Sequence, residues 1–329
     1  MNKLLVFVFL MGGCLLGKVP KKGSPLKRQA PQEEPKEVSQ VSPLNNAGAL
    51  PEKPMVIIIP SYNNAMWYMK NLGSVFDQEY QNYRIIYIDD CSSDDTSLLV
   101  ERMVLEKHQE GRCTLICNKE RRGALANLYY AILQCEDDAI VVTLDGDDWF
   151  AHTKVLQKLN EVYLTQNVWL THGTLRELRR GKEGWCIPIP KSIVAKNAFR
   201  SFRCPSHLRT FYAWLFKKIR FEDLQYEGDF FKMTWDQAIM FPMLEMAGER
   251  HAYIDEVVYI YNDVTPLNDN KVNPQLQRDL EAIIRGKPAY QRLPTGFPAN
   301  TEKIMLERSV VETKGFFSRL KHYKPRWMR

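Results

Sequence analysis

The chain has 329 residues, of which 45% are hydrophobic and 26% are charged, and this is the composition of an ordinary globular enzyme with one large domain or two smaller ones. The net charge is +6, and much of the excess lies in the N-terminal linker and at the end of the chain. No zinc-finger spacing or aromatic-basic RNA signature occurs, so we expect no nucleic-acid partner. Seven cysteines are too few for a disulfide scaffold, and we assign no metal site to them.

The N-terminal sequence predicts a targeting signal. An apolar stretch from Leu4 to Leu16 follows Lys3, and it is shorter than the roughly 20 residues that cross a bilayer. It is typical of a signal-peptide core, and the segment from Met11 to Cys14 resembles a bacterial lipoprotein cleavage box. We expect residues 1–17 to direct the protein to a membrane, the secretory pathway or the cell envelope. A plain secretory signal and a lipoprotein signal both remain open.

Two further segments lie outside the expected folded domain, which we place at residues 54–270. Residues 18–53 are rich in Pro, Lys, Glu, Gln and Ser, so they predict a disordered linker that acts as a tether. Residues 271–329 are expected to form a C-terminal extension. From Lys314 to Arg329 this extension has six basic residues, no acidic ones and several aromatic side chains, which favours either binding to an anionic membrane surface or a solvated basic tail.

Strands and helices alternate through the domain. The run from Met55 to Ile59 is apolar on both faces, as in a parallel sheet covered by helices. This pattern predicts an α/β fold with an open, mostly parallel sheet that binds ligands at the carboxyl ends of its strands. The expected strands are 55–59, 84–88, 114–117, 140–144 and 168–171, with helices after each of the first four and again at 211–218 and 239–246. Cys113 and Cys117 are expected to be small buried side chains.

An acidic turn follows the strand that begins at Ile140. Asp145, Asp147 and Asp148 repel one another at the end of a buried strand unless a cation or hydrogen-bond donors neutralise them. Mg2+ or Mn2+ prefers such oxygen ligands and bridges carboxylates to phosphates, and Gly146 would let that ligand approach the backbone. The alternative is a solvated acidic turn. Neither a dinucleotide-binding glycine motif nor a P-loop occurs in the sequence, so both of those enzyme classes are disfavoured.

Three motifs occur in a specific order. They are the stretch from Val56 to Asn63, the stretch from Ile88 to Thr96, and Asp145-Gly146-Asp147-Asp148. Their order and spacing resemble the nucleotide-sugar motifs of family 2 glycosyltransferases, which have the GT-A fold, over roughly residues 55–263. The resemblance implies an inverting transferase that moves a sugar from a nucleotide-diphosphate sugar, with a UDP-sugar favoured, to a glycan, lipid or protein acceptor.

The resemblance also implies roles for residues on the donor side. Pro60 and Tyr62 would line the pocket for the base and ribose, and Asp90 would accept a hydrogen bond from the nucleobase. Asp145 would face the ribose or the metal, and Asp147 would bind the Mn2+ or Mg2+ that bridges the diphosphate.

A second group resembles the segment beside the sugar diphosphate, and it consists of Asn118, Arg122, Gly123 and Asn127. Arginine pairs are unusual there, although Arg makes bidentate contacts with phosphate. For Arg121 and Arg122, a surface pair at the start of a helix is an equal alternative.

Three later residues complete the expected site. Asp236 resembles the late acidic motif where these enzymes place the catalytic base, and the alternative is a helix N-cap. Asn262 stands where many members have a metal-binding His, and its amide is a weaker ligand. His207 would bind the acceptor or stabilise the leaving diphosphate, although a lone His is more often structural.

Two other functions stay open from the sequence. One is a catalytically inactive GT-A protein that only binds sugar nucleotide or glycan. The other is an aspartate-based phosphotransferase with Asp145 and Asp147 as nucleophile and acid, which is disfavoured because Asp148 follows and the motif is late in the sheet. A calcium loop is also disfavoured, since Trp149 occupies the third ligand position.

Overall fold

The structure, a computed structural model, describes residues 50–203 and 205–294. The predicted targeting segment 1–17, most of the predicted linker and the basic tail lie outside these residues. Within the described ranges, no helix combines the length and apolar character that crossing a membrane requires.

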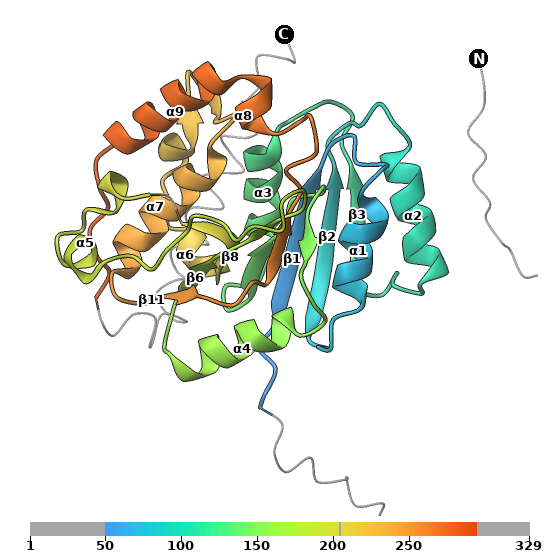
Figure 1. Ribbon diagram of the computed structural model, residues 1–329, viewed down its shortest axis with the longest axis horizontal. Helices are drawn as coiled ribbons and strands as arrows, with labels where there is room; N and C mark the ends of the chain where they lie inside the picture. The colour runs from blue at the N-terminus through green and yellow to red at the C-terminus, as the bar shows by residue number, and fades with distance from the viewer. Residues whose placement is uncertain (1–49, 204, 295–329) are drawn as a thin grey trace, which may run out of the picture. The chain divides into compact units, whose positions relative to one another are not determined.

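In the described part of the chain, a seven-stranded sheet forms the centre of the domain (Figure 1). Its spatial order is β11-β6-β8-β4-β1-β2-β3. Strand β8 is antiparallel to both of its neighbours, β4 and β6, and the other pairings are parallel. This arrangement confirms the expected open, mostly parallel sheet. The strands are β1 (Met55–Ser61), β2 (Tyr83–Asp89), β3 (Cys113–Cys117), β4 (Ile140–Thr143), β6 (Leu170–Gly173), β8 (Ser206–Tyr212) and β11 (His251–Ile254).

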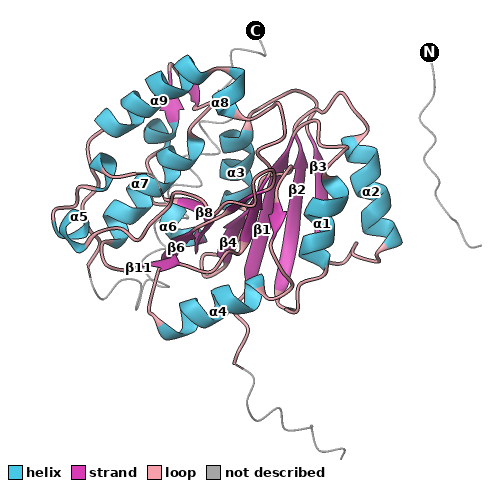
Figure 2. Ribbon diagram, in the orientation of Figure 1, coloured by secondary structure: helices cyan, strands magenta, loops and turns pink. Residues whose placement is uncertain are grey.

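Helices cover both faces of this sheet (Figure 2). Alternate residues of β1 point to opposite faces, so Ile57 packs with α1, α2 and α4, whereas Ile58 packs with α3, α6 and α7. Burial on both faces explains why this strand is a continuous apolar run. The helices are α1 (Tyr68–Phe76), α2 (Thr96–Glu106), α3 (Ala124–Leu133), α4 (Val155–Thr165), α6 (Ala213–Phe216) and α7 (Trp235–Ala247).

A small second sheet joins distant parts of the chain. Strand β12 (Tyr259–Tyr261) lies between β5 (Trp149–Phe150) and β7 (Arg176–Glu177). It is antiparallel to β5, which directly follows the acidic turn. The late segment around residue 260 is therefore held beside that turn. A separate hairpin consists of β9 (Gln225–Tyr226) and β10 (Asp229–Phe230).

The last described helices belong to the same compact unit. The expected domain border after residue 270 falls inside α8 (Asp269–Val272), and α9 (Pro274–Gly286) packs its Leu280 and Ile284 into the core cluster of α7. Short helical segments complete this side: α5 (Lys191–Ala195), η1 (Phe199–Ser201) and η2 (Phe221–Leu224). At the N-terminal border, Oε2 of Glu52 accepts hydrogen bonds from the backbone N–H groups of Gln81 and Asn82. Contacts with the domain therefore begin before residue 54.

A buried ion pair connects α9 to α7. Glu245 of α7 has no exposed side-chain surface, and its carboxylate accepts from Arg200 Nε and Nη2 over 2.6 and 2.9 Å. Arg200 also donates to the carbonyl oxygen of Ile284 in α9 over 2.6 Å. The backbone N–H of Tyr290 donates to Glu245 Oε2 over 2.9 Å. These bonds satisfy a charge pair that would otherwise be costly to bury.

Two local expectations were wrong. The predicted helix 211–218 is a helix only over Ala213–Phe216, because the preceding residues Thr210 to Tyr212 continue β8. The β8 backbone pairs with strands on both sides, and this tertiary pairing overrides the helical spacing. Cys113 is buried as expected, whereas Cys117, at the end of the same edge strand, is exposed.

Candidate functional site

Hydrogen bonds to its backbone hold the acidic turn at the end of β4 in place. The carbonyl oxygen of Pro60 accepts from Gly146 N over 3.1 Å, and that of Asp145 accepts from Asp148 N over 3.0 Å. Asn71 Nδ2 donates to the carbonyl oxygens of both Asp145 and Asp148, over 2.9 and 2.7 Å. The end of β1 and the side chain of Asn71 in α1 therefore hold the turn in one conformation.

Gly146 is required by the packing of the turn itself. A Cβ at this position would lie 2.6 Å from Cβ and Oγ of Ser61 and 2.7 Å from Nδ2 of Asn64. Such distances are too short for a carbon atom, so only glycine fits without a shift. The close neighbours are Ser61 at the end of β1 and Asn64 in the turn that follows it, whereas the sequence led us to expect a ligand there.

Asp148 is a structural member of the acidic turn. Its side chain is buried, with Oδ2 accepting from the Tyr259 hydroxyl over 2.6 Å and Oδ1 accepting from Asn262 N over 2.6 Å. Burial, followed by the charges of Asp147 and Asp145, raises the pKa of Asp148 well above its usual value. Asp148 therefore joins the turn to β12.

Asn262 also holds the turn. Its Nδ2 donates to the carbonyl oxygen of Asp147 over 3.1 Å, and its Oδ1 accepts from Val264 N over 3.1 Å. Asn262, at the position where many family members have a metal-binding His, thus uses both its amide nitrogen and its amide oxygen in hydrogen bonds within the protein.

The other two carboxylates of the turn have the electrostatics of a cation site. Burial, followed by the charge of Asp145, raises the pKa of Asp147 to about 7. Burial also raises the pKa of Asp145, where the charge of Arg209 opposes the shift and that of Asp236 adds to it. Asp269 of α8 has a pKa raised to about 6, mainly by burial. These clustered oxygens suit a hard divalent cation such as Mg2+ or Mn2+, which would relieve their repulsion.

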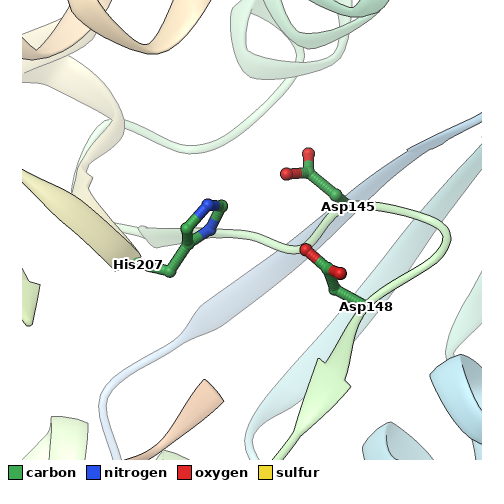
Figure 3. Close-up of side chains that lie close together, drawn as sticks. All are labelled: Asp145, Asp148 and His207. Atoms are coloured by element: carbon green, nitrogen blue, oxygen red, sulfur yellow. The ribbon is translucent and has the colours of Figure 1, made fainter. Parts of the chain in front are cut away.

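His207 of β8 faces the turn. Its ring lies close to the carboxylates of Asp145 and Asp148 (Figure 3), and one ligand atom from each of the three lies within 4.8 Å of the others. The ring stacks on Tyr259, with 4.2 Å between centroids. The structure thus brings His207 into the site, which favours a functional role over a purely structural one.

Arg209 determines which nitrogen of the His207 ring carries the proton. Arg209 Nη2 lies 3.0 Å from His207 Nε2. Because arginine only donates, Nε2 must accept, and the proton of a neutral ring is on Nδ1. Burial, followed by the charge of Arg209, lowers the pKa of His207 well below its usual value, so the ring is neutral. Nδ1 is buried and has no hydrogen-bond partner among the described residues. In this arrangement His207 is a hydrogen-bond donor rather than a metal ligand through Nδ1.

Asp236 reaches the same site from the first turn of α7. Its Oδ2 accepts from Arg209 Nη2 over 3.1 Å, and its side chain is 27% exposed, against 6% for Arg209. The N-cap residue of α7 is Thr234, so the alternative interpretation of Asp236 as an N-cap was wrong.

The predicted donor-side residues gather around Asp90. Its Oδ1 accepts from Asn118 Nδ2 over 2.8 Å and from Arg122 N over 2.9 Å, and its Oδ2 accepts from Gly123 N over 2.8 Å. Burial acts to raise the pKa of Asp90, but these hydrogen bonds outweigh it and the pKa is lowered. Asn118 Nδ2 also donates to Asn127 Oδ1 over 2.8 Å. Asp90 therefore anchors the loop that starts α3.

Tyr62 lies at the end of β1 under an arginine. The guanidinium carbon of Arg121 is 3.7 Å from the centroid of the Tyr62 ring, a close cation–π contact. The arginine that contacts the predicted base pocket is thus Arg121, whereas Arg122 contributes its backbone N–H to Asp90.

Several members of the site were missed in the sequence. Arg209, Tyr259, Asn71 and Asp269 come from different elements, and no local pattern marks them. Asp148 was visible within the acidic motif, but its structural role depends on β12, which is over 100 residues away in the chain.

A pocket of about 490 Å3 opens beside Asp236. It lies between the start of α7, the inner side of α9 and the chain segments around residues 185 and 205. Its lining includes Trp185, Thr234, Asp236, Gln237, Gln277 and Glu281. The cation site and this pocket therefore meet at Asp236.

Part of the chain is similar in sequence to known proteins. Residues 56–183 match the family described as Glycosyl transferase family 2. An uncharacterised glycosyltransferase of Haemophilus influenzae is 30% identical over 118 residues, which are 36% of this chain and 45% of that protein. The Escherichia coli enzyme UDP-Glc:alpha-D-GlcNAc-diphosphoundecaprenol beta-1,3-glucosyltransferase WfgD is 31% identical over 102 residues, 31% of this chain and 38% of that protein. The chain thus spans less than half the length of either relative.

Solved structures share the fold. A crystal structure of S. aureus TarS superposes with a TM-score of 0.50 and 16% identity, covering 64% of this chain and 60% of that one. A TarS structure in complex with UDP-GlcNAc also gives a TM-score of 0.50, with 14% identity and coverage of 70% and 66%. The family match over residues 56–183 identifies this part of the chain as a family 2 glycosyltransferase domain. The order of the sheet and the solved structures show that the domain has the GT-A fold.

Proposed function

We propose that the protein is a glycosyltransferase that moves a sugar from a nucleotide-diphosphate sugar, with a UDP-sugar favoured, to an acceptor hydroxyl with inversion. One observation carries this proposal: the carboxylates of Asp145 and Asp147 share a site with Asp236, whose charge contributes to the raised pKa of Asp145. The donors named for WfgD and for the TarS complex, UDP-Glc and UDP-GlcNAc, support a UDP-sugar.

The donor nucleotide would bind where β1, β2 and β3 end. Tyr62 and Pro60 supply the walls, and Arg121 is the cation above the Tyr62 ring. Asp90 keeps the loop that starts α3 in place by accepting from the backbone N–H groups of Arg122 and Gly123. The side chain of Arg122 would then face the diphosphate. Asp90 would also accept a hydrogen bond from the nucleobase, because its oxygens retain acceptor capacity beyond the bonds from Asn118, Arg122 and Gly123.

Asp145 and Asp147 would hold a divalent cation, with Mn2+ and Mg2+ as the candidates. Their oxygen ligands and mutual repulsion fit such an ion. When bound, the ion supplies positive charge that offsets the charge of the leaving diphosphate. The chain's own contribution is to hold the backbone of the turn that carries both carboxylates, through Pro60 and Asn71.

Asp236 would act as the general base. Displacement at the anomeric carbon requires the acceptor hydroxyl to lose its proton, and one carboxylate near that hydroxyl suffices. Asp236 is partly exposed toward the pocket, whereas its partner Arg209 is buried behind it. Arg209 therefore orients the carboxylate.

A screen of nucleotide sugars tests this function. We expect calorimetry with the full chain to find a UDP-sugar that binds in Mn2+ and far more weakly in chelator, and NMR of the product to show an inverted anomeric centre. Equal affinity in chelator would reject the metal role. Binding of a nucleotide sugar without turnover on any acceptor would instead favour the inactive sugar-nucleotide binder.

We also propose that residues 1–17 bring the enzyme to a membrane or the cell envelope. Fractionation of cells that express the full chain, compared with a chain lacking those residues, tests this. Equal distribution of both chains between membrane and soluble fractions would contradict it.

A further inference from the structure

We propose that the pocket beside Asp236 binds a neutral saccharide as the acceptor and that α9 selects among saccharides. The inference rests on the proposed function and names its acceptor class. Four observations carry it: an unpartnered buried amide, an aromatic side chain, a balanced set of charges and a fixed helical wall.

The amide belongs to Gln237, the residue that follows Asp236 in α7. Gln237 is 7% exposed and lines the pocket, and its Oε1 is buried with no hydrogen-bond partner in the described part of the chain. A buried acceptor without a donor is unfavourable, so a rotation of the Gln237 side chain toward the pocket would gain a hydrogen bond from a ligand O–H group. A sugar carries neighbouring hydroxyl groups. One of them would meet the carboxylate of Asp236 while the next donates to Gln237.

The aromatic side chain is Trp185. Its side chain is 52% exposed although it lines the pocket, and the guanidinium of Arg203 lies 5.7 Å from its ring centroid. An exposed indole beside hydrogen-bonding groups provides an apolar face and a polar rim, which match the C–H face and the hydroxyl edge of a pyranose.

The charges argue against a phosphate as the acceptor group. Two arginines, Arg203 and Arg285, and two carboxylates, Asp236 and Glu281, line the pocket, so their formal charges cancel. Arg285 is already engaged, since its Nε donates to Glu281 over 2.8 Å and its Nη1 to the carbonyl oxygens of Arg200 and Phe202 over 2.6 and 2.8 Å. A site for a lipid phosphate would require an excess of cations directed at the ligand. Neutral hydroxyl groups suit this lining better.

The wall opposite Asp236 is α9. Gln277 and Glu281 lie one turn apart on this helix and both face the pocket. Leu280 and Ile284 bury the other side of α9 in the core, and Arg200 binds its last turn. The wall is therefore formed before any ligand binds, and its two polar side chains can distinguish sugars that differ in hydroxyl configuration.

The reaction in this pocket balances. The acceptor oxygen forms a bond to the anomeric carbon of the donor sugar as the bond from that carbon to the diphosphate oxygen breaks. The electron pair of the broken bond leaves with the diphosphate, and the proton of the acceptor hydroxyl passes to Asp236.

Ligand-observed NMR with the full chain tests the acceptor class without needing a donor. The probes are the methyl glycosides of glucose, galactose, N-acetylglucosamine and N-acetylgalactosamine, with farnesyl phosphate as the lipid-phosphate probe. We expect saturation transfer to at least one glycoside and none to the phosphate. Binding of farnesyl phosphate but no glycoside would overturn the proposal. Calorimetry with UDP-sugars is run in parallel, so that failure of the pocket inference and failure of donor binding are separate results.

Matched variants locate the site. Gln237→Leu and Trp185→Ala should each weaken glycoside binding by about tenfold or more, because they remove a hydrogen bond or the stacking face, and leave UDP-sugar affinity within about twofold. Gln277→Leu should change the ranking of the four glycosides. Gln275→Leu, two residues away on α9 and outside the lining, is the control and should change nothing. Glycoside binding that is equal in wild type and all three pocket variants would place the acceptor elsewhere.

Discussion

Arg209 Nη2 donates to Asp236 Oδ2 over 3.1 Å and lies 3.0 Å from His207 Nε2, so one guanidinium group contacts both side chains. Asp236 belongs to α7, and His207 faces the acidic turn at the end of β4. The arginine therefore couples the position of the proposed base to the position of the donor site. Strand β8 carries both Arg209 and His207 and sets the spacing between them.

Replacing the proposed base should abolish turnover but spare donor binding. Asp236→Asn keeps the shape of the side chain but takes up no proton, so kcat should fall roughly 100- to 10,000-fold. Calorimetry should give a UDP-sugar affinity close to that of the wild type. Asp255→Asn, on an exposed loop, is the charge-matched control. Near-normal turnover of Asp236→Asn would remove it as the base and direct the search to Glu222, Asp223 or Asp229.

Replacing His207 by Asn and by Gln should lower activity to different extents. In His207→Asn the amide lies near the position of Nδ1, whereas in His207→Gln it lies near the position of Nε2. If Nδ1–H donates to the donor substrate, Asn should retain more activity than Gln. Nitrogen-15 NMR of the wild type should show a neutral ring protonated at Nδ1 from pH 6 to 8, as the lowered pKa of His207 requires. A ring protonated at Nε2 would contradict the assignment and restore His207 as a candidate metal ligand.

The stability of the metal-free protein should depend on pH in an unusual direction. The pKa of Asp147 is raised from 3.8 to about 7, and that of Asp269 from 3.8 to about 6. Between about pH 4 and 7 the folded state therefore retains protons that the unfolded state has lost, so stability falls as pH rises through this window and then levels off. Thermal unfolding in chelator, from pH 4.5 to 8, measures this.

Metal binding should reverse that loss, because Mn2+ neutralises the carboxylates when they ionise. Saturating Mn2+ should raise the melting temperature at pH 7.5 far more than at pH 5. Asp147→Asn should melt higher than the wild type in chelator at pH 7.5, and it should lose the stabilisation by Mn2+. A variant that Mn2+ still stabilises as strongly as the wild type would exclude Asp147 from the metal site.

Gly146 gives a test of the packing under the acidic turn. Gly146→Ala places a methyl group 2.6 Å from Ser61, so the turn must shift, at a cost of about 1–3 kcal/mol. Chemical denaturation measures the loss, and Mn2+ titration should show weaker binding. Gly111→Ala is the matched control, since a Cβ there meets no atom within 4 Å. Equal stability of the two variants would mean that the turn adapts.

The sequence predicted the parts of the protein that depend on local pattern. The run from Met55 to Ile59 is buried on both faces as expected, and the three motifs lie at neighbouring strand ends. The residues that fix the chemistry of the site were not predictable in this way. Arg209 was expected just before a helix, yet it lies in β8, and only the pairing of β8 with β4 and β6 brings it to Asp236. Tyr259 likewise meets Asp148 only because β12 pairs with β5.

The buried pair of Arg200 and Glu245 offers a different kind of test. Removing one partner leaves an unpaired buried charge, so Arg200→Met should cost about 3–5 kcal/mol, whereas the double variant Arg200→Met with Glu245→Leu should cost much less. Denaturation of the single and double variants measures the coupling between the two residues. Additive losses would show that the pair does not act as a unit.

The same ion pair keeps the proposed acceptor preference independent of the proposed donor site. Because α9 is joined to α7 by Arg200 and Glu245 and by its own apolar face, the residues that line the acceptor pocket can change without altering the sheet that carries the acidic turn. A chimaera that exchanges residues 274–286 for the corresponding helix of a relative, with Leu280 and Ile284 retained, would then inherit a new acceptor preference together with the old donor. For the proposed transferase, the replacement of one helix would be the route to a new glycosidic linkage.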